Sequence, residues 1–177
     1  MSVEIPDSVT WIGSFVFSNC TSLASVKIPN GLKTIDDGAF YNCTSLASVE
    51  ISNSVTSIGF ETFYKCISLT SVEIPDSVKI IESKAFANCT NLTSVEIPNS
   101  AATISDFVFA NCTNLTSVVI PEGVSFIGSS AFKGCNQLTS ITFQGTKAEW
   151  EKIVKGSDWN SNTGDYTIHC KDGDIQK

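Results

Sequence analysis

The sequence contains no arginine: all eleven basic residues are lysines, against eighteen acidic residues, and the formal net charge is −7. Nucleic-acid binding relies on a basic surface that neutralises phosphates, so this composition argues against a nucleic-acid partner. The chain also lacks an apolar run of the roughly 18 residues that a transmembrane helix needs, so we expect no membrane insertion in this segment.

Histidine is nearly absent as well, since His169 is the only one. A single histidine cannot form the usual metal cluster, and no serine or cysteine triad can be placed with it by spacing. We therefore expect no catalytic residues, no metal and no cofactor, and we interpret His169 as a residue on a strand surface. The sequence predicts a protein that is not an enzyme.

The N-terminus lacks both a basic segment and a long apolar segment, so we expect no secretory signal in this chain. Because the chain begins in the middle of a repeat, we interpret Met1 as an added start on a fragment or mature segment. The 177 residues are 42% hydrophobic and 16% charged, a balance typical of one globular domain with a sizeable core.

What the sequence does contain is an internal repeat of 23 residues. Several apolar positions keep this register without slippage. The isoleucine column comprises Ile5, Ile28, Ile51, Ile74, Ile97 and Ile120, and Phe143 continues it. The phenylalanine column comprises Phe17, Phe40, Phe63, Phe86, Phe109 and Phe132. A unit this short cannot bury its own apolar face, so successive units must stack and cover one another.

Each repeat contains one predicted strand, at the segment Leu-x-x-Val-x-Ile. Val26 and Ile28 point to one face and Ser25 and Lys27 to the other, and Pro29 then ends the hydrogen-bonded ladder. We expect about seven such strands in one parallel sheet. Residues 38–43 are too few for a full helix and are predicted to make one helical or 3₁₀ turn that places a phenylalanine in the core.

The repeat breaks after residue 143. Thr146 and Glu149 have the spacing of a helix capping box, and Trp150, Ile153 and Val154 then form one apolar stripe on a short helix. Residues 166–170 alternate like a strand. We therefore predict two parts, six to seven stacked repeats over residues 1–143 and a C-terminal cap over residues 144–177.

No comparable cap precedes the first repeat. The stacking edges of five apolar residues in the first repeat are therefore expected to be open: Val3, Ile5, Val9, Ile12 and Phe17. Exposed apolar patches mark contacts or aggregation. We expect either self-association through residues 3–17 or raised mobility there.

The repeated pattern Leu-x-x-Val-x-Ile-Pro-x-x-Val-x-x-Ile-Gly-x-x-x-Phe-x-x-Cys resembles the BspA-like leucine-rich repeats of bacterial and some protist surface proteins. The resemblance covers about residues 2 to 143. It implies an α/β-type leucine-rich-repeat solenoid with a parallel β-sheet, short helical or 3₁₀ turns and a C-terminal helix-plus-strand cap. Four positions depart from the pattern: Ser52 replaces proline, Ala101 valine, Ile67 threonine and Gly134 asparagine.

Six of the seven cysteines occupy one column of the repeat: Cys20, Cys43, Cys66, Cys89, Cys112 and Cys135. Stacking would give them parallel Cβ directions, which are unsuitable for a disulfide, and none has the paired spacing of a zinc site. We predict six free thiols shielded in the core. The Asn-x-Thr triplets that recur beside them match glycosylation sequons, but we interpret the asparagines as residues that bond the turn backbone.

The outward positions of the predicted strands carry the candidate binding residues. One column contains Glu4, Lys27, Glu50, Glu73 and Glu96, and the column beside it includes Ser48, Ser71 and Ser94. Three stacked carboxylates would lie about 5 Å apart, as in retaining glycosidases, but catalysis also needs a pocket that raises one pKa. A solvated acidic stripe, a surface for a basic partner and a weak cation site remain as alternatives.

Trp11, Ile80 and Phe126 share another column, in which the other repeats have serine or threonine. Apolar residues where hydroxyls are tolerated indicate either partner contact or local packing. The direction of Trp11 is undecided, because Val9 and Ile12 are three residues apart.

The resemblance implies a non-catalytic, surface-exposed protein-binding or adhesion module that uses its strand face. Some family members bind host matrix proteins such as fibronectin and fibrinogen, so the expected partner is a host matrix or cell-surface protein, and the expected location is extracellular or on the cell surface. The alternative is a passive structural spacer within a larger surface or secreted protein.

Overall fold

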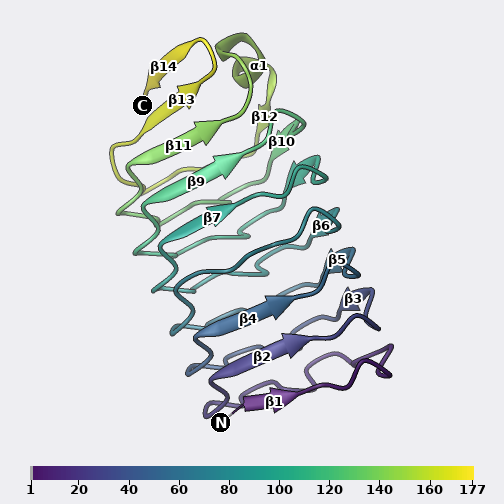
Figure 1. The fold of residues 1–177 in the computed structure, drawn as a ribbon. Helices are drawn as coiled ribbons and strands as arrows, with labels where there is room; N and C mark the ends of the chain where they lie inside the picture. Colours follow the sequence, from purple (N-terminus) through teal and green to yellow (C-terminus); the bar gives the residue numbers. More distant parts are fainter. Residues whose placement is uncertain (1) are drawn as a thin grey trace.

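The computed structural model describes residues 2–177, which form a stack of coils from the N-terminus to the C-terminus (Figure 1). Each 23-residue repeat makes one coil. We number the coils from the serine that opens each repeat, so that coil 1 starts at residue 2, coil 4 at residue 71 and coil 7 at residue 140. The predicted solenoid of parallel strands is thereby confirmed.

Most coils contribute one strand to the same side of the stack. These strands are β1 (Ser2–Glu4), β2 (Ser25–Ile28), β4 (Ser48–Ile51), β7 (Ser94–Glu96), β9 (Ser117–Ile120) and β11 (Ser140–Phe143). The strands pair in parallel with Val3 beside Val26 and Val26 beside Val49, so equivalent positions of successive repeats are neighbours. Val26 and Ile28 are buried while Lys27 is exposed, as the alternation predicts.

A second set of strands, each two residues long, lies behind the first. It comprises β3 (Thr34–Ile35), β5 (Ser57–Ile58), β6 (Ile80–Ile81), β8 (Thr103–Ile104), β10 (Phe126–Ile127) and β12 (Val154–Lys155). In the first five of these, the first residue points outward and the second is a buried isoleucine. Sequence analysis did not predict this ladder, because two residues are too few to show an alternation.

The segment after each short strand is a series of turns with i→i−3 hydrogen bonds and not a continuous helix, and it buries Phe40, as the helical or 3₁₀ turn expected for residues 38–43 would. The Tyr41 amide donates to the Gly38 carbonyl at 2.9 Å, but the Phe40 amide donates to Thr62 in the next coil, also at 2.9 Å. Alternate amides therefore bond within the turn and to the neighbouring coil, which a helix cannot do.

Two columns of each coil adopt left-handed backbone conformations. One of them contains Asn19, Asn42, Lys65, Asn88, Asn111 and Gly134. Asparagine and glycine tolerate this region better than other residues, which explains both the recurring asparagine and its replacement by glycine. The Asn42 side chain donates to the Asn19 side chain at 2.8 Å. The expectation that these asparagines bond turn backbone was therefore wrong for this pair.

The core is a column of stacked aromatic rings. Phe40, Phe63, Phe86 and Phe109 are fully buried. Their ring centroids are 5.2 to 5.6 Å apart, with nearly parallel planes. Offset stacking at this separation is favourable beyond the area that it buries. The phenylalanine column therefore ties each coil to the next.

The C-terminal segment closes the top of the stack (Figure 1). Helix α1 (Lys147–Lys152) begins at the predicted capping box of Thr146 and Glu149, and it buries Trp150. The Trp150 ring lies 5.3 Å from the Phe143 ring. Strand β13 (Thr167–Cys170) then pairs in parallel with β11, and β14 (Gly173–Gln176) pairs with β13 in the antiparallel sense.

The predicted apolar stripe on this helix was wrong at one residue. The helix ends at Lys152, and the backbone of Ile153 is extended. Val154 therefore leaves the helix, joins β12 beside Phe126 and is 62% exposed. Pairing with the neighbouring coil ends the helix earlier than the apolar spacing indicated.

Coil 1 is less open than expected. Val3, Val9 and Phe17 are partly buried, whereas Ile5 and Ile12 are only 9% and 7% exposed. The prediction of an open edge was therefore wrong for the two isoleucines. Both belong to the continuous hydrophobic core of the stack.

Coil 4 interrupts the sheet that the sequence predicted to be continuous. Strands β1, β2 and β4 form one sheet, and β7, β9, β11, β13 and β14 form another, so Ser71–Ile74 belong to neither. The short strands divide as well, into β3-β5-β6 and β8-β10-β12. Neither ladder therefore crosses from coil 4 to coil 5. Ala101 occupies the column that holds valine or leucine in other coils, and its missing methyl groups leave less packing at this junction.

We expect the amides of Ser71–Ile74 to exchange with solvent at least about tenfold faster than those of Ser25–Ile28, because no hydrogen bond in residues 2–177 protects them. Hydrogen-exchange mass spectrometry measures both segments in one sample. Ala101→Val should slow exchange of Ser71–Ile74 and leave Ser25–Ile28 unchanged. Equal exchange of the two segments in the wild type would contradict the interruption.

Candidate functional site: the strand face

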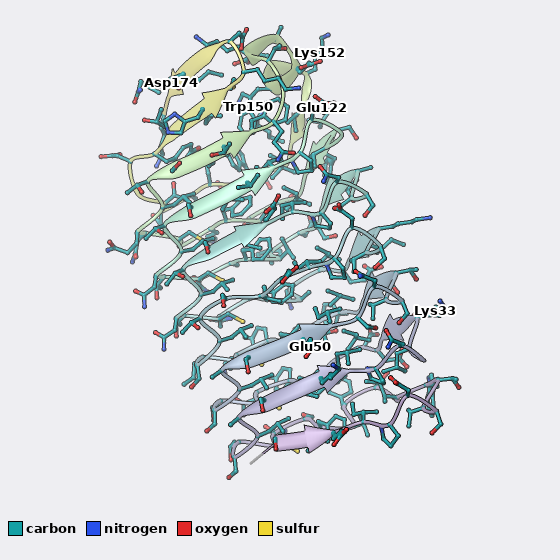
Figure 2. The ribbon with its side chains drawn as sticks, viewed as in Figure 1. Lys33, Glu50, Glu122, Trp150, Lys152 and Asp174 are labelled. Carbon is teal, nitrogen blue, oxygen red and sulfur yellow. The ribbon has the colours of Figure 1, made fainter. Side chains whose placement is uncertain are left out.

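The outward side chains of the longer strands form one continuous surface, which we call the strand face. Its acidic column contains Glu4, Lys27, Glu50, Glu73 and Glu96, and all five are exposed. Its serine column includes Ser48, Ser71 and Ser94, which are also exposed. The parallel register places Glu4, Lys27 and Glu50 side by side, and Figure 2 shows Glu50 on β4. Ser71, Glu73, Ser94 and Glu96 line one hollow further along the stack.

Charge is distributed unevenly along the strand face. Lys27 Nζ lies 2.7 Å from Glu50 Oε1, and this hydrogen bond and the carboxylate charge raise the pKa of Lys27. Both side chains are more than half exposed, so the pair contributes little to stability. No ion pair within residues 2–177 involves Glu73 or Glu96. Negative charge is therefore uncompensated at coils 4 and 5.

Two hollows lie on the strand face. The larger, of about 540 Å³, is lined by residues of coils 3 to 5, including Ser71, Glu73 and Glu96. The other, of about 460 Å³, lies over β1, β2 and β4 and contains the Lys27–Glu50 pair. Both are open depressions on a surface of small polar residues. Glu50 is bound to a lysine and exposed, which is not the apolar environment that a glycosidase acid requires.

The second proposed group of contact residues does not lie on the strand face. Trp11, Ile80 and Phe126 are 71%, 51% and 37% exposed. Ile80 and Phe126 belong to the short-strand ladder, in β6 and β10, and Trp11 occupies the equivalent position of coil 1. These residues belong to coils 1, 4 and 6, so the structure does not bring them together. The sequence left the direction of the Trp11 side chain undecided, and the structure shows that it faces solvent.

His169 extends the acidic column into the C-terminal segment. It lies beside Thr142 in the register of β11 and β13 and is exposed, as predicted for a strand-surface residue. Its Nδ1 is 2.9 Å from Asp174 Oδ1 on β14. Sequence analysis missed this pair because it depends on the antiparallel pairing of β14.

Five cysteines form a buried column beside the aromatic core. Cys43, Cys66, Cys89, Cys112 and Cys135 are fully buried, and their thiols donate to the carbonyl of the phenylalanine 26 residues earlier at 3.1 to 3.3 Å. Burial raises the pKa of each, to about 11 for Cys43 and about 12 for Cys135.

Cys20, in contrast, is exposed, so the prediction that all six column cysteines are shielded was wrong for this one. Each buried cysteine lies between the coil before it and the coil after it. Cys20 is in coil 1 and has a neighbouring coil on one side only. The six column cysteines are free thiols, as predicted, and so is Cys170.

We expect a thiol reagent to label Cys20 and the partly exposed Cys170 rapidly in the folded protein. The five buried thiols should react roughly 10⁴-fold more slowly, because labelling requires an opening that costs about 5 kcal/mol or more. Mass spectrometry after timed labelling would show two fast adducts, and seven in denaturant. More than two fast adducts in the native protein would contradict the buried column.

Stacked coils with one parallel strand each and an open polar strand face define a leucine-rich-repeat solenoid. The chain belongs to the BspA type leucine rich repeat region family, whose pattern matches six copies over residues 1–66 and 34–154. The family resemblance inferred from the repeat is thus confirmed. Solenoids of this class generally act as protein-interaction modules, because stacking produces extended binding surfaces.

Solved structures agree with this assignment. The chain is 30% identical to the Treponema pallidum leucine-rich repeat protein, with a TM-score of 0.65 over 76% of this chain and 69% of that one. It is 25% identical to a leucine-rich repeat protein from Eubacterium ventriosum, with a TM-score of 0.63 over 69% of this chain. It spans 32% of the length of the Eubacterium protein. No curated protein matches the chain in sequence.

Two further observations concern the part of the chain that the structure describes. No group of three or more histidine, cysteine, aspartate or glutamate side chains is placed to hold a metal ion. No helix there has the length and apolar character to cross a membrane.

Proposed function

We propose that this chain is a non-catalytic protein-binding module, displayed on a cell surface or secreted, that attaches to its partner through the strand face. The observation that supports this most is the strand face itself. It runs the length of the stack and carries small polar side chains, and two open hollows lie on it. The small serine and threonine side chains leave the charged column exposed.

The expected partner is a host matrix or cell-surface protein, as the resemblance to adhesion proteins suggests. A direct test measures binding of the intact chain to immobilised fibronectin and fibrinogen, and to cultured cells, by interferometry and by an attachment assay. Saturable binding with a Kd in the micromolar range or tighter supports the proposal. Absence of saturable binding to all of these surfaces would contradict it.

The alternative is a passive spacer inside a larger surface protein. A spacer needs only a stable stack, and the buried phenylalanine column supplies one without any partner. The two functions differ in the same assay, because a spacer shows no saturable binding. Surface labelling of the native full-length protein would test the extracellular location that both functions require.

Self-association through residues 3–17 is a separate proposal about coil 1. Val3, Val9 and Phe17 are only partly buried, whereas the equivalent Phe40 is fully buried. Two chains that stacked their first coils would bury this apolar edge.

Replacing Ile5 and Val9 with polar residues should then abolish any dimer detected by light scattering, because it removes apolar area from the contact. Replacing Thr34 and Thr103, which are exposed on another surface, should not. A monomeric wild type whose coil 1 is as protected from hydrogen exchange as coils 2 and 3 would refute this proposal.

A further inference from the structure

The larger hollow of the strand face coincides with the interruption of the sheet. Ser71, Val72, Glu73 and Ile74 all line it, and these are the residues whose backbone groups make no hydrogen bond within residues 2–177. Strands β2, β9 and β11 pair with a neighbour on each side, whereas β4 and β7, which flank the interruption, pair on one side only. Backbone donors and acceptors require partners, so Ser71–Ile74 and the facing edges of β4 and β7 have unused hydrogen-bonding capacity at this hollow.

The charges around this hollow have one sign. Glu73, Asp76 and Glu96 line it, and no lysine does. One Asp76 oxygen accepts a hydrogen bond from the Asn99 amide at 2.8 Å, so this carboxylate is held in place at the rim. The smaller hollow differs, because Lys27 lies within it and neutralises Glu50. Charge complementarity therefore favours a cationic partner at coils 3 to 5.

The shape favours a polypeptide segment over a small cation. A volume of about 540 Å³ lies within the range of ordinary ligand sites, and the hollow is open rather than enclosing. Backbone groups follow one another along Ser71–Ile74 at about 3.3 Å per residue, the spacing of an extended partner chain. Recognition of an extended peptide by backbone groups together with side chains is a common mode.

We propose that the strand face of coils 3 to 5 binds an extended protein segment rich in lysine or arginine. Cationic side chains contact Glu73 and Glu96, and the segment's backbone bonds to Ser71–Ile74. This inference rests on the proposed function, because it specifies the partner of the same strand face. It deepens that function by naming the chemistry and the position of the contact.

The test uses a fluorescent octalysine peptide and the intact chain, with binding followed by fluorescence anisotropy at low salt. Wild type should bind the peptide, and Glu73→Gln with Glu96→Gln should weaken binding at least about tenfold, because two uncompensated charges are lost. The matched control is Glu82→Gln with Glu151→Gln, which removes the same charge from exposed positions outside the hollow. This control should bind within about twofold of wild type.

Spermine separates a peptide site from simple charge attraction. It carries several positive charges but no peptide backbone, so it should compete with octalysine at least about tenfold less well than unlabelled octalysine does. Equal loss in both variant pairs, equal competition by spermine, or no octalysine binding by wild type would each overturn the inference. Saturable attachment to matrix proteins or cells would then leave the proposed function standing, whereas loss of that attachment would refute the proposed function itself.

Discussion

The protein is expected to lose its stability steeply as the pH rises above about 9. Five thiols are buried in the core, and burial raises the pKa of each of them, to about 11 for Cys43 and about 12 for Cys135. The folded chain therefore keeps these protons at a pH where the unfolded chain, with ordinary thiols, releases them. Unfolding then releases protons and is favoured by alkali.

These pKa values determine whether the free energy of unfolding rises or falls with pH, and over which pH range it changes. The stabilisation is fully present below the unfolded thiol pKa of about 9 and is lost as the pH rises through the folded values. Each thiol contributes a slope of about 1.4 kcal/mol per pH unit, so five contribute roughly 7. A domain with an unfolding free energy of about 5 to 15 kcal/mol should therefore unfold within about one to two pH units.

Denaturant melts in reducing buffer, from pH 8 to 11, measure this slope. Cys89→Ser keeps a hydroxyl donor for the Phe63 carbonyl, and it should reduce the slope by about 1.4 kcal/mol per pH unit. Cys20→Ser is the matched control, because Cys20 is exposed, and it should leave the slope unchanged. A free energy of unfolding that stays constant up to pH 10.5, or equal slopes in wild type and Cys89→Ser, would contradict the buried thiol column.

Phe86→Ala is expected to be among the costliest single substitutions. Phe86 is fully buried, and its ring lies 5.2 Å from that of Phe63 and 5.6 Å from that of Phe109. Removing it opens a cavity between coils and breaks two stacked contacts, for a loss of about 3 to 5 kcal/mol in the free energy of unfolding.

Glu73→Ala provides the comparison in the same coil. Its side chain is exposed and has no ion pair within the described residues, so the change should stay within about 0.5 kcal/mol. Urea or guanidinium melts of both variants give the two changes in the free energy of unfolding under one set of conditions. Equal losses would show that the columns of the repeat do not divide into core and surface as described.

Much of the fold could be predicted because the 23-residue register repeats one physical requirement. The residues equivalent to Val26 and Ile28 point inward in each coil, so one repeat predicted the strand position in every coil except coil 4. The capping box at Thr146 was equally predictable, since Thr146 and Glu149 complete each other over three residues. Because the repeats stack in register, the phenylalanine and cysteine columns could also be predicted.

Other features depend on contacts that a repeat pattern does not contain. Ser71–Ile74 pair with neither β4 nor β7, although they have the same four residues as the paired strand Ser48–Ile51. Cys20 is exposed because it lies in coil 1, although its local sequence matches that of Cys43. Val154 leaves the helix to pair with Phe126. In each case a neighbouring coil, or the lack of one, overrides the local sequence.

The candidate site was predictable only in part. The exposed columns of serine and glutamate followed from alternation, and the structure places them on one face. The uneven charge along that face required the geometry of the Lys27–Glu50 pair. The hollow at coil 4 required the interrupted sheet. Trp11 and Ile80 shared a column in the sequence, yet they lie three coils apart on another surface.

The measurement that tests the central claim most directly compares two surfaces of the same stack in one attachment assay. Ser48→Tyr with Ser94→Tyr places bulky groups on the strand face, and Thr34→Tyr with Thr103→Tyr places the same groups on the short-strand ladder. Because all four positions are exposed, both pairs should fold like the wild type, which circular dichroism checks. We expect the strand-face pair to lose at least about tenfold in affinity for matrix protein or cells, and the ladder pair to bind like wild type. Loss of binding in the ladder pair, with the strand-face pair unaffected, would contradict the assignment of the strand face as the binding surface.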